Sequence, residues 1–375
     1  MSGPYTALRA VLDDAVAGRI VPTAAVLVGD CDRVLFEHYA GATAETVYDL
    51  SSLSKPLATV ASLLRLVAAD AVRLDTRVAE IVPDFARGST ERNEVTVRDL
   101  LCHRAGLPAH RRYFEALASE ERRTGQRLVA TAAGARRIQE LASIEPLERS
   151  VGSAAVYSDV GFIVLGRIVE HVSSARMDRT FDEAVIVPLA LHSTGFIDLE
   201  APSPPDLAAR AAPCGVCDWR DCEVRGCVQD ENAYAMGGIA GHAGVFSTAR
   251  DVHRIVAAHV RAYRGERGLF EPKLVREVWR RDDRTAATTW THGWDTPSAT
   301  ASSAGTRIGS PAVGHLGFTG TSAWIDLERG IHVVLLTNRL QAGAEPAGIR
   351  ALRPRVHDAA FAAVDETTGR AGERR

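Results

Sequence analysis

Short β-rich runs stand near both ends of this chain, and most of the sequence between them has the spacing of helices. Residues 24–29 and 34–40 are two such runs, separated by a short polar turn, and they predict a hairpin. Residues 312–326 and 331–338 are two more. Strands from opposite ends of a chain can bury their apolar faces in one core if they share a sheet. The pattern therefore predicts an α+β fold: one antiparallel sheet from the N- and C-terminal strands, flanked by helices, with a mostly helical middle.

The helical segments place the middle of the chain in a second lobe. Apolar residues recur at helical spacing in several stretches, and glycine- or proline-rich stretches separate them. Helices are expected at residues 5–17, 52–69, 95–107, within 111–147, at 162–172 and 347–364, a loop at 201–213, and tight turns at 232–249. We expect one structural unit over residues 1–375, with a sheet lobe of residues 1–50 and 243–375 and a mostly helical lobe of residues 51–242.

Composition and charge exclude several classes of partner. The 375 residues are 46% hydrophobic and 24% charged, which is ordinary for a globular protein with a sizeable core. The formal net charge of −3 gives no electrostatic case for binding nucleic acid or an anionic membrane. No apolar run is long enough to span a bilayer, and the first residues lack the charged start and apolar core of a signal peptide. We therefore expect a cytoplasmic protein with mostly reduced cysteines, and we leave its oligomeric state open.

Ser52 and Lys55 are the first residues whose pattern predicts chemistry. They stand three positions apart where a helix begins, and positions i and i+3 share one helix face, so the hydroxyl and the amine could meet. A neutral amine could take the hydroxyl proton and make the serine a nucleophile. This spacing alone arises often by chance. However, only two of the 44 basic residues are lysine, and arginine cannot lose its proton whereas a partly buried lysine can. The rarity of lysine favours the catalytic interpretation.

Four cysteines lie close together in the sequence, in the pattern C-x2-C-x4-C-x4-C. They are Cys214, Cys217, Cys222 and Cys227. The spacing is that of a zinc knuckle with cysteine in the usual histidine place, and it predicts one structural Zn²⁺. The alternative is four reduced thiols, or disulfides in an oxidised sample. The acidic residues around the cysteines argue against a knuckle that binds nucleic acid.

Three separated motifs resemble those of the penicillin-recognising serine hydrolases, in the same order and rough spacing. They are Ser52-Leu53-Ser54-Lys55, Tyr157-Ser158-Asp159 and His315-Leu316-Gly317. Supporting segments at residues 100–107, 244–249 and 333–338 are also similar to that family. The resemblance covers nearly the whole chain. It is to the branch that contains class C β-lactamases, D-alanyl-D-alanine carboxypeptidases and β-lactamase-like esterases.

This resemblance implies a two-lobed fold with its site in the cleft between the lobes, and a reaction that needs no metal. It implies that Ser52 is acylated and that Lys55 and Tyr157 share the general acid–base work, each lowering the other's effective pKa. The backbone N–H groups of Ser52 and Phe318 would form the oxyanion hole. His315, on the edge strand, would line the cleft beside the substrate, and Gly317 of the same motif would belong to the substrate-binding residues.

Two residues depart from the pattern of the β-lactamases and peptidases. Asp159 stands where many of them have asparagine, and a second ionisable group near Lys55 could hold the lysine protonated and leave Tyr157 as the stronger base. His315 stands where many relatives have lysine, which weakens the fixed positive charge that binds a substrate carboxylate. His242, in the glycine-rich loop that relatives place near the rim of the cleft, is a further candidate for substrate contact.

These features predict a metal-independent serine hydrolase that forms an acyl-enzyme on Ser52 and acts on a small-molecule ester or amide. The departures at Asp159 and His315 disfavour β-lactam hydrolysis and D-Ala-D-Ala carboxypeptidase activity, which stay as alternatives. An acyltransferase could use the same acyl-enzyme with an alcohol or amine as acceptor. A non-catalytic ligand-binding protein on this fold is the alternative from a different class. The sequence does not name the acyl or the leaving group.

Overall fold

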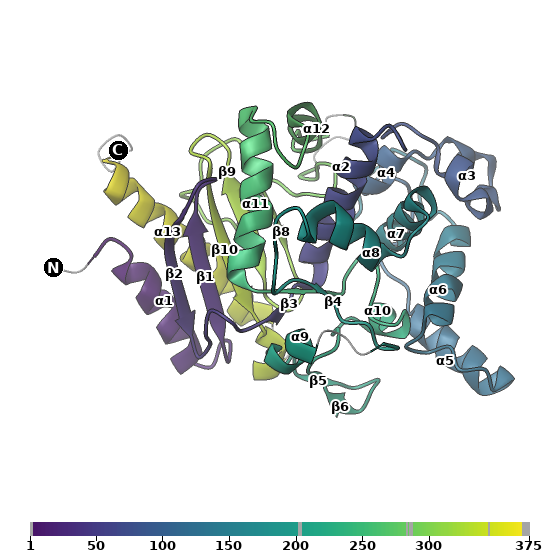
Figure 1. Ribbon diagram of the computed structural model, residues 1–375, viewed down its shortest axis with the longest axis horizontal. Helices are drawn as coiled ribbons and strands as arrows, with labels where there is room; N and C mark the ends of the chain where they lie inside the picture. Colours follow the sequence, from purple (N-terminus) through teal and green to yellow (C-terminus); the bar gives the residue numbers. More distant parts are fainter. Residues whose placement is uncertain (1–2, 202–204, 283, 285–287, 344–345, 370–375) are drawn as a thin grey trace.

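A five-stranded antiparallel sheet joins the two ends of the chain, as the sequence predicts. The computed structural model describes residues 3–201, 205–282, 284, 288–343 and 346–369. The strands are β1 (Ala24–Gly29), β2 (Val34–Ala40), β8 (Ala312–Leu316), β9 (Ser322–Asp326) and β10 (Ile331–Thr337). Their order is β2-β1-β10-β9-β8, so the N-terminal hairpin meets the C-terminal strands where β1 pairs with β10 (Figure 1).

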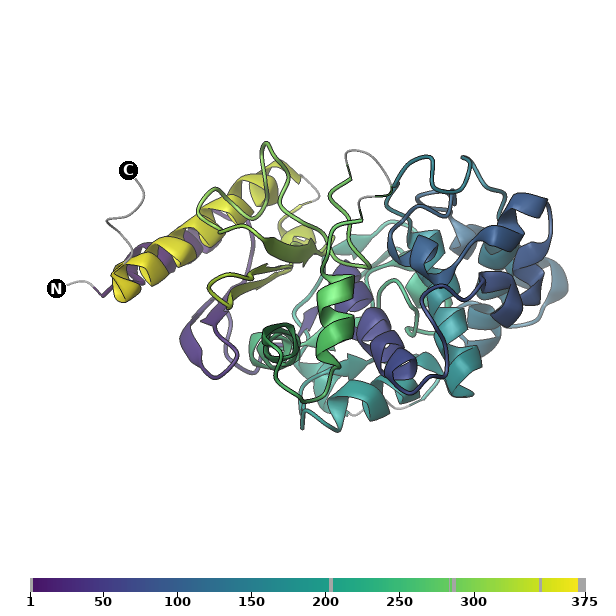
Figure 2. The same ribbon diagram turned by 90° about the horizontal axis from the view of Figure 1, so that it is seen from above.

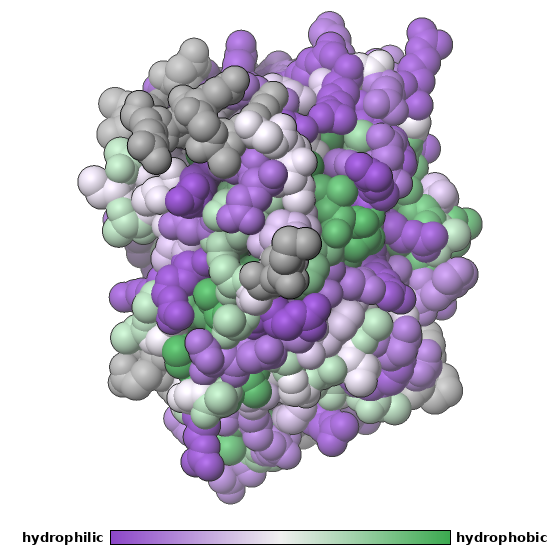
Figure 3. All heavy atoms as spheres, turned by 90° about the vertical axis from the view of Figure 1, so that its left-hand side faces the viewer, coloured by the Kyte–Doolittle hydropathy of each residue, from purple (hydrophilic) through white to green (hydrophobic). Residues whose placement is uncertain are grey.

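Helices cover both faces of this sheet. α1 (Thr6–Ala17) and α13 (Pro346–Thr368) lie on one face, and α11 (Ala249–Arg264) lies on the other, as Figures 1 and 2 show. Leu8 of α1 and Phe361 of α13 belong to the buried cluster that packs this helix pair on the sheet. The outer side of the pair, which faces the viewer in Figure 3, is mostly hydrophilic, with hydrophobic residues in small separate patches. The central strands β1 and β10 are therefore buried on both faces, whereas the edge strand β2 is mostly half-buried.

The other α-helices in the described part of the chain lie beyond α11, on the side away from α1 and α13 (Figure 1). They are α2 (Ala61–Ala68), α3 (Val78–Ile81), α4 (Val97–Leu101), α5 (Tyr113–Thr124), α6 (Ala132–Ile144), α7 (Asp159–Ser173), α8 (Met177–Phe181), α9 (Pro205–Arg210), α10 (Glu231–Ala235) and α12 (Pro272–Val278). Short 3-10 helices lie at Pro83–Ala86, Thr90–Glu94 and Arg339–Ala342, and a π-helical segment lies at Asp182–Ile186. In the described part of the chain, we find no helix with the length and apolar character to cross a membrane.

Two small sheets complete the fold. β3 (Tyr48–Asp49), β7 (Val245–Ser247) and β4 (Gly195–Phe196) form a three-stranded sheet in the order β3-β7-β4. β5 (Val216–Cys217) and β6 (Cys222–Glu223) form a separate hairpin. β3 directly precedes the segment that carries Ser52, and its pairing with β7 anchors the start of that segment.

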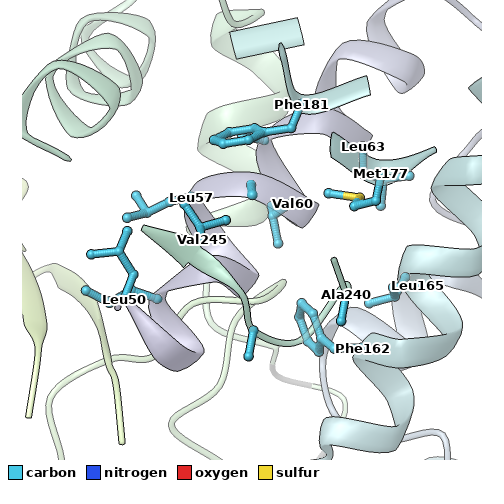
Figure 4. Packing of buried hydrophobic residues seen from close by; sticks show 14 of the residues in the cluster. Leu50, Leu57, Val60, Leu63, Phe162, Leu165, Met177, Phe181, Ala240 and Val245 are labelled. Carbon is cyan, nitrogen blue, oxygen red and sulfur yellow. The ribbon is translucent and has the colours of Figure 1, made fainter. Parts of the chain in front are cut away.

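The helical segment that carries Ser52 and Lys55 is buried in the middle of the molecule. A 3-10 turn at Ser51–Leu53 leads into a π-helical segment at Lys55–Val60 and then into α2. All residues of the π-helical segment are buried. Figure 4 shows side chains of this segment, among them Leu57 and Val60, packed with side chains of α7, α8 and β7. This packing fixes the first turn of the helix from several sides, and wide π turns are frequent at functional sites.

The predicted β run at residues 312–326 is two strands instead of one. A turn at residues 317–321 separates β8 from β9, and its Gly320 has a φ of 107°. Only glycine adopts such a φ without strain. The apolar residues on both sides hid this turn in the sequence pattern.

Other differences from the predicted elements come from local capping and burial. The helix expected at residues 95–107 is the shorter α4, which begins with a capping box between Thr96 and Asp99. The loop expected at residues 201–213 contains α9, and residues 202–204 lie outside the described part. The region expected to form only tight turns, residues 232–249, contains most of α10 and all of β7.

Candidate active site

Lys55 contacts Ser52, as the spacing predicts. Its ammonium Nζ donates to Ser52 Oγ at 2.9 Å and to the backbone carbonyl of His242 at 2.9 Å. It also lies 2.7 Å from Asp159 Oδ1, and the lysine side chain is 0% exposed. Three acceptors therefore surround the three N–H donors of this ammonium, which compensates in part for its burial.

Tyr157 reaches the same hydroxyl from the loop before α7. Its hydroxyl donates to Ser52 Oγ at 2.8 Å. Its ring lies 4.8 Å from the ring of His103 and 5.2 Å from that of Trp290, measured between centroids. His103 Nδ1 accepts the backbone N–H of Ser158 at 3.1 Å, so this buried histidine holds the loop that presents Tyr157. His103 is therefore a structural support of this loop.

Charges around Lys55 decide which groups carry protons. Burial lowers the pKa of Lys55, but the carboxylate of Asp159 and the oxygen of Tyr157 outweigh it and raise that pKa to about 12. Burial raises the pKa of Asp159, whereas the Lys55 charge holds it well below its usual range. Burial raises the pKa of the Tyr157 hydroxyl, and the lowering by Lys55 does not compensate. The expectation that Lys55 and Tyr157 lower each other's pKa holds in one direction only: Lys55 lowers the pKa of Tyr157, whereas Tyr157 raises that of Lys55. The resting site holds an ammonium, a carboxylate and a neutral phenol.

His110 is a site residue that the sequence reasoning missed. Its Nδ1 lies 3.6 Å from Asp159 Oδ2, and its side chain is 45% exposed at the cleft. The interaction with Asp159 raises the pKa of His110. No motif marked this residue, because the contact joins a loop to the start of α7 across 49 positions of sequence. Asp159 therefore contacts both the buried Lys55 and the half-exposed His110 at the cleft.

The turn after β8 presents a backbone donor beside the nucleophile. The N–H of Phe318 donates to Ser51 Oγ at 3.1 Å. Gly317 packs so closely that an added Cβ would stand 2.0 Å from Thr321 Oγ1 and 2.6 Å from the Leu50 carbonyl oxygen. A glycine is therefore required there, and the turn is fixed against the segment that precedes Ser52. The Phe318 N–H thus has the Ser51 hydroxyl as its partner in the resting site, and its role as an oxyanion donor stays a prediction.

His315 lines the cleft as a neutral side chain. Its Nδ1 donates to the carbonyl oxygen of Leu316 at 2.8 Å, since that oxygen can only accept. Burial first, and then the charge of Lys55, lower the pKa of His315 to about 3. Its Nε2 therefore presents a lone pair, and among the described residues this atom has no hydrogen-bond partner. His315 supplies no positive charge, as the sequence analysis expected.

The cleft itself has a volume of about 940 Å³. Ser52, Tyr157 and Asp159 lie at its surface. The lining also includes Ser51, His110, Gln229, Asp230, Glu231, Trp290, Asp295, His315, Gly317, Phe318, Arg339, Arg350 and Arg353. Acidic side chains and three arginines both occur in this lining, so the loss of a cation at position 315 does not leave the cleft without positive charge.

His242 lies behind the cleft wall and does not line it, so the expected substrate contact is wrong. The residue is 1% exposed, and its ring Nε2 lies 2.9 Å from Asp230 Oδ1. Its backbone carbonyl accepts from Lys55. His242 therefore supports the site through its backbone and through Asp230, which does line the cleft. The glycine-rich loop indicated that His242 lies near the site, but it did not show that the side chain of His242 fails to line the cleft.

The four cysteines do not form the expected zinc site. Among the described residues, no group of three or more His, Cys, Asp or Glu side chains lies close enough together to hold a metal ion. Cys214 and Cys217 are buried against Val224, whereas Cys222 is exposed. The β5–β6 hairpin, this small apolar cluster and Arg220, which donates to the Val228 carbonyl at 2.7 Å, order the loop that carries the cysteines.

Comparison with known sequences shows which protein family this chain is similar to. The profile of the Beta-lactamase family matches residues 8–356. A candidate D-alanyl-D-alanine carboxypeptidase of Escherichia coli (strain K12) is 32% identical over 329 residues, which are 82% of this chain and 72% of that protein. Its counterpart in Salmonella agona (strain SL483) is 31% identical over 323 residues, 81% of this chain and 72% of that protein.

Solved structures share the fold at lower sequence identity. EstCE1, described as a hydrolase with promiscuous acyltransferase activity, matches with a TM-score of 0.70 and 20% identity, covering 96% of this chain and 98% of that chain. A mutant of the simvastatin synthase LovD from Aspergillus terreus matches with a TM-score of 0.71 and 16% identity, covering 97% of this chain and 96% of that chain. At these identities the likeness shows the fold alone. Since the family profile spans most of the sequence, the chain belongs to the Beta-lactamase family.

Proposed function

We propose that this protein forms an acyl-enzyme on Ser52 and hydrolyses small esters or amides. The observation that carries the proposal is the environment of Ser52 Oγ. It lies 2.9 Å from Lys55 Nζ and 2.8 Å from the Tyr157 hydroxyl, at the surface of a cleft of about 940 Å³. Nucleophilic catalysis by serine needs a group within hydrogen-bond reach that can take the hydroxyl proton, and a space for the substrate. The Tyr157 oxygen, beside the Lys55 charge, supports the first, and the cleft supports the second.

In the proposed mechanism the proton of Ser52 passes through Tyr157. Lys55 is held as an ammonium and Tyr157 is neutral, so neither is a free base at rest. With substrate bound, the Tyr157 hydroxyl turns its proton from Ser52 Oγ to the leaving oxygen or nitrogen. As Oγ attacks the acyl carbon, its own proton moves to the Tyr157 oxygen, and Tyr157 gives its proton to the leaving group. The Oγ–acyl bond forms, the bond to the leaving group breaks, and the net charge of the site is the same before and after the step. Lys55 stays cationic and stabilises the negative charge that develops on the two oxygens.

Deacylation runs the same proton path with a second nucleophile. Water gives a proton to Tyr157 as it attacks the acyl carbon, and Tyr157 returns a proton to Ser52 Oγ. An alcohol in place of water would give acyl transfer by the same steps. In both half-reactions the N–H groups of Ser52 and Phe318 would hold the oxyanion. The Ser51 hydroxyl, which accepts the Phe318 N–H at rest, would give up that bond to the substrate oxygen.

A second candidate substrate class is peptides that end in a carboxylate near the scissile bond. The observation in its favour is the cluster of Arg339, Arg350 and Arg353 in the cleft lining beside Phe318. Burial first, and then the charge of Arg339, lower the pKa of Arg353 to about 10. An anionic ligand beside Arg339 and Arg353 would offset this repulsion between their positive charges. The name of the Escherichia coli relative, a candidate D-alanyl-D-alanine carboxypeptidase, supports the same class.

An activated-serine probe tests the proposal before any substrate is known. A fluorophosphonate forms an Oγ–phosphorus bond and releases fluoride, so the labelled peptide identifies the nucleophile by mass spectrometry. We expect labelling at Ser52 and none in Ser52→Ala. The unmutated protein should then be assayed with p-nitrophenyl butyrate, an N-acyl D-Ala-D-Ala peptide and nitrocefin, with and without an added alcohol. Failure to label Ser52, with no turnover of any of these substrates, would favour the non-catalytic binding protein.

A further inference from the structure

Asp49 is a buried carboxylate that joins two walls of the cleft. It stands in β3 directly before the segment of the nucleophile, and it is 1% exposed. Its Oδ1 accepts the backbone N–H of Ser51 at 2.8 Å, and its Oδ2 accepts the backbone N–H of Gln229 at 2.7 Å. Its backbone carbonyl accepts the hydroxyl of Thr319, in the turn after β8, at 2.8 Å. One residue therefore contacts three separate segments that shape the site.

The two contacts of the Asp49 carboxylate reach residues that line the cleft, Ser51 and Gln229. Ser51 precedes the nucleophile and has a φ of 50°, in the left-handed region that residues other than glycine rarely adopt. Its hydroxyl is also the partner of the Phe318 N–H. Gln229 lines the cleft next to Asp230, the partner of His242. A conformation as uncommon as that of Ser51 persists only where its surroundings enforce it, and the Asp49 carboxylate provides one such restraint.

We infer that Asp49 is a positioning residue for Ser52: its carboxylate holds Ser51 and Gln229 where the reaction on Ser52 needs them. This inference rests on the proposed function. Asp49 touches neither the nucleophile oxygen nor the space for substrate, because it does not line the cleft. It acts through the backbone of Ser51 and through the wall at Gln229.

The protonation state of Asp49 should therefore tune the site. Burial raises the pKa of Asp49 to about 6, the two backbone N–H groups lower it, the charge of Asp230 raises it and that of Arg220 lowers it. The thiols of Cys214 and Cys227 also face this carboxyl, and burial raises the pKa of both, so they stay neutral in the same range. A protonated carboxyl turns one oxygen into a donor, and that oxygen can no longer accept an N–H in the same geometry. One of the two restraints is then lost.

Asp49→Asn reproduces the protonated form at every pH, because its amide nitrogen also faces an N–H group. We would measure the rate of Ser52 labelling by the fluorophosphonate probe between pH 5 and 8. The wild-type rate should fall about tenfold from pH 8 to pH 5. The rate of Asp49→Asn should be about tenfold lower than wild type at pH 8 and should change little toward pH 5.

A matched control separates positioning from general loss of structure. Asp251 is also a buried carboxylate, with Oδ2 accepting the Ser193 N–H at 2.8 Å and the Thr194 hydroxyl at 3.0 Å, but it does not line the cleft. Asp251→Asn should lower thermal stability and keep the wild-type pH profile. In the Asp49→Asn background, Ser51→Gly should restore much of the labelling rate at pH 8, because glycine adopts a positive φ without restraint.

The outcomes discriminate between the inference and the proposed function. If wild-type Ser52 is not labelled at any pH, the proposed function fails and the inference fails with it. If wild type is labelled but Asp49→Asn keeps the wild-type rate, or keeps the acidic fall below pH 6, the inference alone is overturned. Should Asp49→Asn not fold, the single variant Ser51→Gly decides, because its acidic fall must be smaller than that of wild type. An unchanged fall in Ser51→Gly would also overturn the inference.

Discussion

Replacing Asp159 with asparagine tests the claim that Lys55 works as a cation. The carboxylate lies 2.7 Å from Nζ, and asparagine keeps its shape and one acceptor oxygen while removing the charge. At an effective dielectric constant of about 20, the lost attraction is about 6 kcal/mol. Since about 1.4 kcal/mol corresponds to one pH unit in a pKa, this loss brings the pKa of Lys55 from about 12 down to near neutrality. In the wild type, Lys55 keeps its proton throughout the pH range of an ordinary assay, whereas in the variant it loses that proton within this range.

The expected result is a new basic limb in the rate profile of Asp159→Asn. With p-nitrophenyl butyrate between pH 5 and 10, kcat/KM of the variant should fall as Lys55 loses its proton, because the neutral amine no longer stabilises charge on Ser52 Oγ and Tyr157. His110 also contacts Asp159, so the profile should be repeated in a His110→Gln background. A profile parallel to wild type would show that Asp159 does not hold Lys55 protonated. A rate that rises with the loss of that proton would show that neutral Lys55 is the base, which would refute the proposed proton path.

The same variant makes a prediction about stability. The folded-state pKa of Lys55 is raised above its unfolded value, so its contribution is present below about pH 10.5 and lost as pH rises through about 12. The folded-state pKa of Asp159 is lowered, so its contribution is present above its unfolded pKa and lost as pH falls. Breaking a buried pair by removing one partner costs about 3–5 kcal/mol. Denaturant unfolding of Asp159→Asn should show this loss at pH 6 and a smaller loss at pH 9, whereas Asp178→Asn, which breaks a half-buried pair with Arg176, should show little change with pH.

Three further substitutions address the other parts of the site. Lys55→Arg should lower kcat/KM at least 100-fold, because the larger guanidinium does not fit a fully buried site, and retention of most activity would contradict the contact with Ser52. Gly317→Ala should lower both kcat and the melting temperature, because its Cβ would stand 2.0 Å from Thr321 Oγ1; an unchanged melting temperature would refute the close packing. Arg350→Gln, at an exposed position of the cleft, should raise KM for a D-Ala-D-Ala peptide about fivefold and leave p-nitrophenyl butyrate unchanged; equal effects on both would remove the case for an anion site.

Local patterns in the sequence were enough to predict the sheet and the central contact of the site. The strands β1, β2 and β10 follow from apolar runs bounded by turn residues, and their joint sheet follows from the need to bury them together. The contact of Ser52 with Lys55 needs only three positions of helical geometry. The strands themselves and the Ser52–Lys55 contact depend on short-range geometry, whereas the joint sheet depends on shared burial, and both predictions are confirmed. The division into two lobes at residues 50 and 243 stays a prediction.

The residues that sequence reasoning missed act across long separations. Asp49 meets Gln229 across 180 positions, and no local pattern marks either one. The arginines at the cleft could not be recognised, because 42 arginines are spread over the chain. The zinc prediction failed for a related reason, since cysteine spacing cannot show that a short hairpin and its own small apolar cluster already order the loop. Chain composition therefore limited which side chains could be recognised as functional.

The motifs alone do not show where the cleft carries positive charge. The motif residue His315 is buried and neutral, so an argument from that strand alone predicts a preference for uncharged substrates. Arg350 and Arg353 come from α13 and Arg339 from the 3-10 helix that follows β10, and they line the same end of the cleft as Phe318. Arg353 also donates to the carbonyl of Gly317 at 2.6 Å, which couples this positive charge to the turn that carries the proposed oxyanion donor. An anionic group that binds to Arg353 would therefore contact the same side chain that holds the turn with the Phe318 N–H in place. Selectivity for charge and stabilisation of the transition state would then depend on the same turn, and variants of the arginines should change kcat as well as KM for anionic substrates.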